Sequence, residues 1–144
     1  MKKLVNISLF YAVAAMAGGV FFREITRFTD FEGSTSLGVV HTHLFLLGMF
    51  FFLLLLLLDR KFGLSSRRGF GKFLWIYNAG LVITTAGLIW RGITQVMGMQ
   101  ISIGIDTLIS IVSGIGHILL GIGIIVFFVL LKRQISGVPV KKKK

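Results

Sequence analysis

Residues 39–58, VVHTHLFLLGMFFFLLLLLL, form an almost purely hydrocarbon run that opens with two histidines. A run of about 20 apolar residues is long enough to cross the hydrocarbon core of a bilayer as an α-helix. Three further runs of this kind occur along the chain, so we expect four membrane spans, at 4–22, 37–58, 73–90 and 108–131. The sequence therefore predicts an all-α integral membrane four-helix bundle that forms a single domain over residues 1–144.

The positive charges lie almost entirely on one side of these spans. Thirteen of the sixteen Lys and Arg residues fall at the N-terminus, between spans two and three, or after span four. Positive charge collects in the cytoplasmic segments of membrane proteins, so we expect both termini to be cytoplasmic. This distribution explains the net charge of +11 without nucleic acid as a partner, and we expect the basic tail at 132–144 to contact anionic lipid.

All three histidines of the chain lie inside predicted spans, His41 and His43 in the second and His117 in the fourth. Ionisable side chains within a membrane are costly and mark functional sites. At a rise of 1.5 Å per residue, the three lie about 22 to 27 Å from the cytoplasmic ends of their spans, all in the outer half of the membrane. Residues i and i+2 of a helix lie about 200° apart, so His41 and His43 are predicted to face two different neighbours or a site shared between copies.

Imidazole is a common ligand of heme iron, copper and zinc. The chain has no cysteine, which excludes thiolate metal sites and covalent c-type heme attachment, and the predicted spans contain no acidic residue. We therefore expect heme b, bound non-covalently by His41 and His43, with His117 as an alternative ligand that pairs with His43 in one bundle. Copper or zinc on the same three histidines is the alternative.

Three arginines, Arg23, Arg27 and Arg91, lie on the same side of the membrane as the histidines. Guanidinium binds carboxylate in a bidentate fork, so these arginines are candidate partners for the propionates of a heme. Anchoring to lipid headgroups, beside the aromatic ring of Trp90, is the alternative role.

The chain resembles a family of short four-span bacterial membrane proteins of unknown function. The resemblance is carried by four stretches: FFREITRF, LGVVHTHLFLLGMFFFLLLLLLDRK, WIYNAGLVITTAGLIWRGITQVMG and SGIGHILLGIGIIVFF. It covers nearly the whole chain and implies a multi-pass protein of the bacterial cell membrane, but it brings no activity.

Span two also resembles the catalytic subunits of heme–copper oxidases and nitric oxide reductases, which carry a His-Thr-Asn-like stretch on their second helix and His-x-His on their tenth. Those subunits consist of three arcs of four helices around a pseudo-threefold axis. The resemblance implies that one chain corresponds to one arc and a homotrimer to the whole, with heme between His41 of one copy and His43 of the next. This chain lacks that family's copper-ligand histidine pair and cross-linked tyrosine, which argues against reduction of oxygen or nitric oxide by this chain alone. His117 has no counterpart in that scheme.

We therefore expect a homo-oligomeric membrane heme protein, a trimer rather than a dimer, for electron transfer, redox or gas sensing, or heme handling. Its partner in a respiratory chain is not indicated by the residues. A small metal-ion or proton transporter or channel, in which the histidines pass the cargo, is the first alternative. An accessory subunit without a cofactor, whose histidines bond between helices, is the second. The sequence identifies no catalytic acid, base or nucleophile.

Overall fold

The computed structural model of the protein describes residues 2–137. Within this range the helices are α1 (Lys2–Phe28), α2 (Leu37–His43), η1 (Leu44–Phe50), α3 (Phe51–Phe62), η2 (Leu64–Ser66), α4 (Phe70–Val96) and α5 (Ile103–Ser136). The segment η1 is π-helical, and η2 is a short 3-10 turn. Because α2, η1 and α3 continue directly into one another, we call their combined length span two.

Four helices of the described chain are long and apolar enough to cross a membrane: Lys2–Phe28, Leu37–Phe62, Phe70–Val96 and Ile103–Ser136. This finding confirms the all-α prediction and fits a multi-pass membrane protein. Each predicted span lies within one of these helices, which continue into the flanking polar residues. The side of the membrane that holds the termini, and assembly into oligomers, stay predictions.

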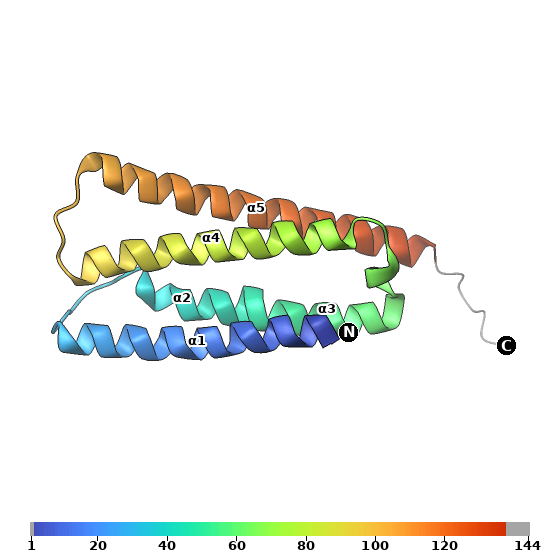
Figure 1. The fold of residues 1–144 in the computed structure, drawn as a ribbon, viewed down its shortest axis with the longest axis horizontal. Coiled ribbons are helices and arrows are strands. Elements are labelled where there is room, and N and C mark those ends of the chain that lie inside the picture. The colour runs from blue at the N-terminus through green and yellow to red at the C-terminus, as the bar shows by residue number, and fades with distance from the viewer. Residues whose placement is uncertain (1, 138–144) are drawn as a thin grey trace.

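The four long helices run side by side (Figure 1). The start of α1, the end of α5 and the connection between α3 and α4 lie at one end of the bundle, which we call the terminal end. We call the opposite end, with the connections at 29–36 and 97–102, the loop end. Helix α1 packs along span two, span two packs on α4, and α4 packs on α5.

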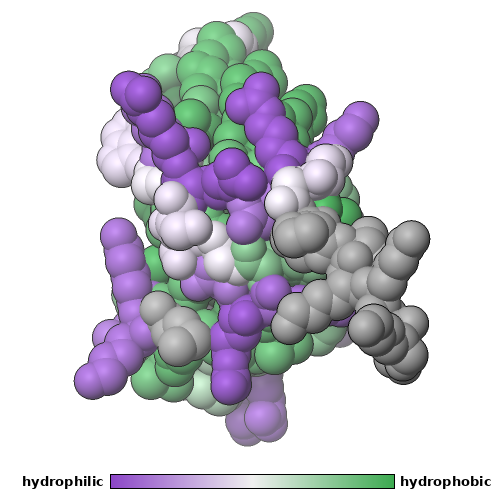
Figure 2. All heavy atoms as spheres, turned by 90° about the vertical axis from the view of Figure 1, so that its right-hand side faces the viewer, coloured by the Kyte–Doolittle hydropathy of each residue, from purple (hydrophilic) through white to green (hydrophobic). Residues whose placement is uncertain are grey.

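Hydrophilic side chains project from the terminal end, whereas the flanks of the bundle behind them are hydrophobic (Figure 2). This distribution is typical of a protein whose flanks contact lipid and whose end contacts water. Four lysines of the predicted basic tail, residues 141–144, lie outside the described residues.

Glycines allow α4 and α5 to approach closely. A Cβ atom added at Gly80 would lie 2.6 Å from Leu120 N, and one added at Gly116 would lie 2.5 Å from Thr84 N. Small residues take the place of hydrophobic force as the packing device between membrane helices. The close α4–α5 contact fixes the height and rotation of α5, which carries His117.

Aromatic rings connect span two to α4 and α5 in the half of the bundle nearer the terminal end. Phe51 stacks on Tyr77 of α4 with ring centroids 4.2 Å apart, and it meets Phe127 of α5 edge-on at 5.4 Å. Tyr77 is completely buried. Ring pairs in these geometries stabilise beyond the area they bury. The cluster thus sets the position of α5 relative to span two, and so of His117 relative to His43.

Candidate functional site

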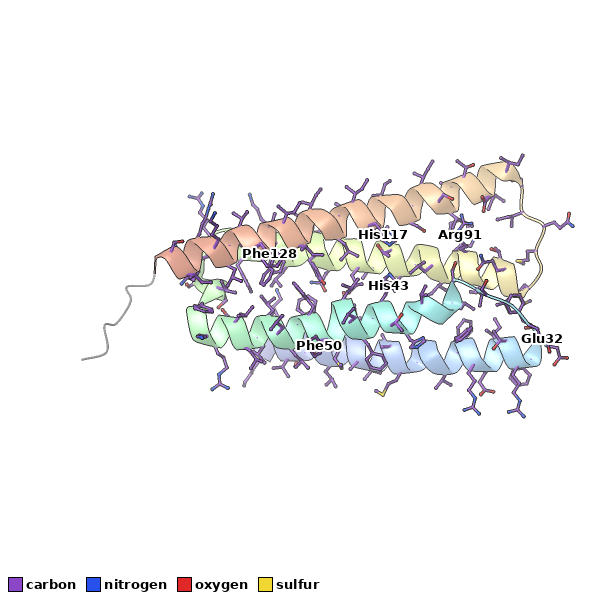
Figure 3. All side chains as sticks on the ribbon, turned by 180° about the vertical axis from the view of Figure 1, so that it is seen from behind. Glu32, His43, Phe50, Arg91, His117 and Phe128 are labelled. Carbon is purple, nitrogen blue, oxygen red and sulfur yellow. The ribbon has the colours of Figure 1, made fainter. Side chains whose placement is uncertain are left out.

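The rings of His43 and His117 lie next to each other between α2 and α5 (Figure 3). Their centroids are 6.3 Å apart and their planes are nearly perpendicular, at 88°. His43 is partly buried and His117 is exposed on the flank of the bundle. The structure therefore brings together two imidazoles from different spans, the pairing that the sequence gives as the alternative to His41 and His43.

The hydrogen bonds of the two rings fix their tautomers. Nδ1 of His43 lies 2.8 Å from the carbonyl oxygen of Val39, and Nδ1 of His117 lies 2.8 Å from that of Ser113. A carbonyl oxygen can only accept, so each Nδ1 carries the proton and donates it. In the neutral ring, Nε2 then holds a free lone pair. This arrangement, with Nδ1 held by a backbone carbonyl, is typical of metal-ligating histidines.

His41 faces the other way from His43, as the spacing of two residues predicts. Its ring lies against Gly18 and Gly19 of α1, where an added Cβ atom would come within 4.0 Å of the histidine side chain. The Nδ1 atom of His41 is buried and has no hydrogen-bond partner among the described residues. His41 thus lies at the α1–α2 contact and does not join the His43–His117 pair.

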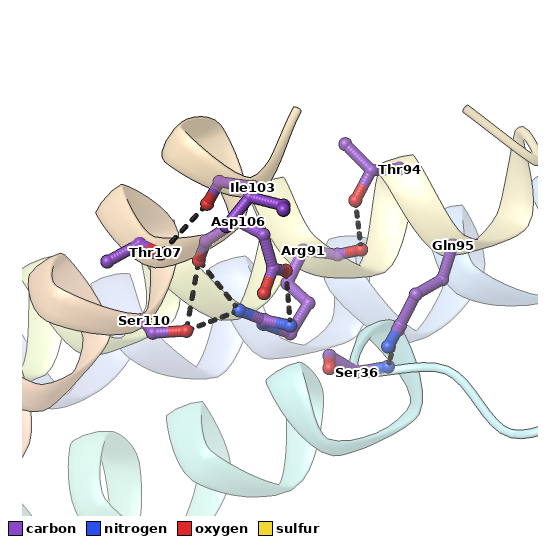
Figure 4. A network of polar contacts seen from close by, with 8 residues as sticks. All are labelled: Ser36, Arg91, Thr94, Gln95, Ile103, Asp106, Thr107 and Ser110. Atoms are coloured by element: carbon purple, nitrogen blue, oxygen red, sulfur yellow. Dashed lines mark hydrogen bonds and ion pairs between the residues drawn. The ribbon is translucent and has the colours of Figure 1, made fainter. Parts of the chain in front are cut away.

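Arg91 is held in a polar cluster toward the loop end of α4 and α5 (Figure 4). Its Nη1 forms an ion pair with Asp106 Oδ1 at 3.0 Å, and its Nη2 donates to Ser110 Oγ at 2.7 Å. The Arg91 side chain is 30% exposed. Because Ser110 and His117 are seven residues apart on α5, they share a helix face about 10 Å apart along the axis. The seven-residue spacing of Ser110 and His117 is visible in the sequence. The contacts of Asp106 and Ser110 with Arg91 are known only from the structure.

Arg23 and Arg27 lie on α1, on the far side of span two from α5. The Arg23 side chain is 78% exposed and approaches Glu24 at 3.9 Å. Arg27 is also exposed. The structure therefore brings one of the three candidate arginines, Arg91, to the same helix pair as His117, and keeps the other two apart.

The connection before α2 is tied to α4 at the loop end. Thr35 Oγ1 donates to the carbonyl oxygen of Gly92 at 3.1 Å, and the backbone N–H of Ser36 donates to Gln95 Oε1 at 2.8 Å. At Gly92, an added Cβ atom would lie 2.5 Å from Leu37 N. These contacts hold the start of α2 against α4, and His43 lies less than two turns further along.

Metal sites with three or more protein ligands are not formed by the residues that the structure describes: no group of three His, Asp or Glu side chains comes together there. Tetrahedral zinc and copper sites need such a group. A groove of about 810 Å³ lies away from the histidines and nearer the terminal end, between α1 and α4, and includes Lys3, Tyr11, Trp75 and Asn78 in its lining. The His43–His117 pair is therefore a two-ligand site.

Comparison with known proteins shows the family of the chain. A family model described as "Protein of unknown function (DUF2871)" matches residues 1–134. No curated protein and no solved structure matches the chain. Since the match spans nearly the whole chain, the protein belongs to the DUF2871 family of proteins of unknown function.

Proposed function

We propose that the protein is a membrane heme-b-binding protein in which His43 and His117 of one chain would hold the iron. Its role is electron transfer, redox or gas sensing, or heme handling. The single observation that carries the proposal is the facing imidazole pair, with each Nδ1 bonded to a carbonyl and each Nε2 left free to bind.

The separation of the rings fits an ion bound between them. Metal–imidazole nitrogen bonds are about 2.0 Å long, so two rings on opposite sides of one ion have centroids about 6 Å apart. The observed separation is 6.3 Å. The separation of the rings therefore supports an iron held between His43 and His117.

Heme suits this pair better than bare copper or zinc does. A porphyrin supplies four nitrogen ligands itself and needs only one or two from the protein. His43 and His117 supply two, whereas the described residues assemble no third ligand for a tetrahedral ion. The absence of cysteine from the sequence means that the heme would be held without thioether bonds.

Arg91 lies where it can hold a carboxylate of the cofactor. It is held by Asp106 and Ser110 on the helix pair that carries His117, and Ser110 lies about 10 Å from His117 along the α5 axis, toward the loop end. A propionate at the rim of a porphyrin bound to His117 would extend over a similar distance along α5. Arg23 and Arg27 lie on α1, so a role for them in propionate binding requires a cofactor between two copies of the chain.

We further propose a homo-oligomer, a trimer in preference to a dimer, with both termini in the cytoplasm of a bacterial cell. His41 is then the candidate ligand between copies. Its buried Nδ1 without a partner supports a role for this ring beyond packing, because an unpaired polar atom is costly in the membrane. Closed symmetry would repeat such a site at each interface.

Titration of the purified protein with hemin, Cu²⁺ and Zn²⁺ tests the proposal against its alternative. We expect saturable uptake of one heme per chain, and loss of that uptake in His43→Ala and in His117→Ala. Saturable copper or zinc binding by a chain that takes up no heme would contradict the proposal and favour a metal-ion transporter. Native mass spectrometry of the same samples measures the number of copies in the assembly.

A further inference from the structure

A π-helical segment follows His43 directly. It runs over the seven residues Leu44–Phe50 and lies between the two α-helical parts of span two. A π-helical turn is rare, appears mostly as a bulge inside an α-helix, and is frequent at functional sites.

Between Val40 and Phe52 the buried face of span two contains about one residue more than three turns of a regular helix accommodate. Steps of three and four residues alternate on the buried face of a regular helix, whereas Val40, Leu44, Gly48 and Phe52 follow one another at steps of four. Each such step overshoots a turn by about 40°, so three of them rotate a regular helix by about 120°. The wider π-helical turn absorbs this rotation. It keeps Val40 and Phe52 on the same buried face, and it sets the direction in which His43 points.

The hydroxyl of Tyr77 on α4 donates a hydrogen bond to a backbone carbonyl that the Phe51 N–H does not reach in the π-helical segment. In an α-helix, the Phe51 N–H would donate to the carbonyl oxygen of Leu47. It bonds instead to the carbonyls of Leu46 and Gly48. The hydroxyl of Tyr77 donates to the Leu47 oxygen at 2.9 Å. In lipid a backbone carbonyl without a partner is costly, so this bond stabilises the wide turn.

Ser8 of α1 makes the matching contact from the other side. Its hydroxyl donates to the carbonyl oxygen of Met49 at 2.9 Å, and the Ser8 side chain is buried. Gly48 allows α1 to approach, because an added Cβ atom there would lie 2.5 Å from Tyr11 Cγ. The two hydroxyls thus hold the π-helical segment from α1 and α4.

We propose that Ser8 and Tyr77 are positioning residues for the histidine site: their hydroxyls stabilise the π-helical turn at Leu44–Phe50, and this turn orients His43 toward His117. The value of this orientation to the protein rests on the proposed function, but the orientation itself can be measured without heme.

Paired cysteines in the cysteine-free chain test the proposal. His43→Cys and His117→Cys are introduced together, and the full-length protein in bilayers is treated with a short bifunctional thiol reagent. We expect efficient cross-linking in this background. Adding Ser8→Ala and Tyr77→Phe, which remove the two hydroxyls and leave the Tyr77 ring stack in place, is expected to lower the yield severalfold.

Deletion of Leu46 tests whether the two hydroxyls act by positioning His43 or by stabilising the whole bundle. Leu46 is 63% exposed, and its deletion changes the three steps of four into a regular alternation of three and four. Val40, Leu44, Gly48 and Phe52 then fall on one face of a regular α-helix, and the hydroxyls are no longer needed. We expect the deletion to restore the cross-link in the Ser8→Ala/Tyr77→Phe chain, and Ser8→Thr to preserve it without any deletion.

Arg67→Cys with Gln134→Cys serves as the matched control, because these side chains are hydrogen-bonded at the terminal end, away from the π-helical segment. Its cross-link is expected to stay unchanged in every variant.

Unchanged cross-linking of positions 43 and 117 without the hydroxyls overturns the proposal, as does a loss that deletion of Leu46 fails to restore. If the double variant does not fold, deletion of Leu46 alone decides: retained cross-linking supports the proposal, and loss contradicts it. Cross-links that respond as expected in a chain that takes up no heme overturn the proposed function and leave the positioning result standing.

Discussion

The imidazole rings of His43 and His117 lie 6.3 Å apart between α2 and α5, whereas His41, only two residues from His43, faces α1. His41 and His43 therefore have different neighbours. The site within one chain is formed by His43 and by His117 of α5. This relationship decides which substitutions are expected to weaken binding of the proposed heme.

Loss of either ring of the pair is expected to weaken heme binding. His43→Ala and His117→Ala each remove one of the two proposed iron ligands, and we expect at least about a tenfold weaker affinity for heme, since even loss of an outer partner of a ligand costs that much. Free imidazole is expected to restore the low-spin visible spectrum by filling the cavity. Thr42→Ala, at the exposed residue between His41 and His43, is the control and keeps the full heme content. Heme loss in His41→Ala alone would instead support ligation between copies.

Arg91→Gln is expected to weaken heme binding without disrupting the bundle. A charge-assisted hydrogen bond contributes about 1.5–3 kcal/mol, which corresponds to a roughly 10- to 100-fold weaker affinity if Arg91 holds a propionate. The midpoint of unfolding of the heme-free protein should change little, because the Arg91–Asp106 pair is partly exposed. Arg27→Gln is the matched control on α1. Equal effects of the two substitutions would contradict a specific role for Arg91.

Two glycines on α5 are expected to respond differently to the same change. Gly116→Ala places a Cβ atom 2.5 Å from the backbone of α4, and such overpacking costs about 1–3 kcal/mol. Gly114 has open space around it, so Gly114→Ala should leave stability unchanged or raise it by up to about 1 kcal/mol through helix propensity. Thermal unfolding in detergent measures both. Equal destabilisation by the two variants would argue against the close α4–α5 contact.

The predicted topology can be tested with single cysteines in the cysteine-free chain. Ser65→Cys lies in the connection between α3 and α4, and Ser34→Cys in the connection between α1 and α2. With the termini in the cytoplasm, a membrane-impermeant thiol reagent added to intact cells labels position 34 and not position 65. The reverse pattern would place the histidines in the cytoplasmic half of the membrane.

Much of the fold follows from the sequence. Four apolar runs predict the four long helices, and the two-residue spacing of His41 and His43 predicts that they face different neighbours. The pairing of His43 with His117 depends on which helices are adjacent, and apolar residues cover every side of these spans, so periodicity does not reveal it. The π-helical segment could not be predicted from the sequence for the same reason. Within an apolar run, nothing distinguishes the buried residues Leu44, Gly48 and Phe52 from their neighbours.

The contacts of Arg91 could not be predicted from the sequence for a different reason. Arg91 is a candidate from charge alone, but its partners Asp106 and Ser110 come from another helix, across a connection of irregular structure. The sequence places Ser110 on the face of His117 and gives no sign that Arg91 reaches it. Contacts between helices, rather than the helices themselves, are what the sequence leaves open.

The most direct test of the central claim is the visible spectrum of the detergent-purified protein, recorded as isolated and after reduction with dithionite. The account predicts a Soret band and sharp reduced α and β bands, the signature of low-spin heme with two histidine ligands, and their loss in His117→Ala. A flat spectrum that persists after the cells are supplied with heme would contradict it.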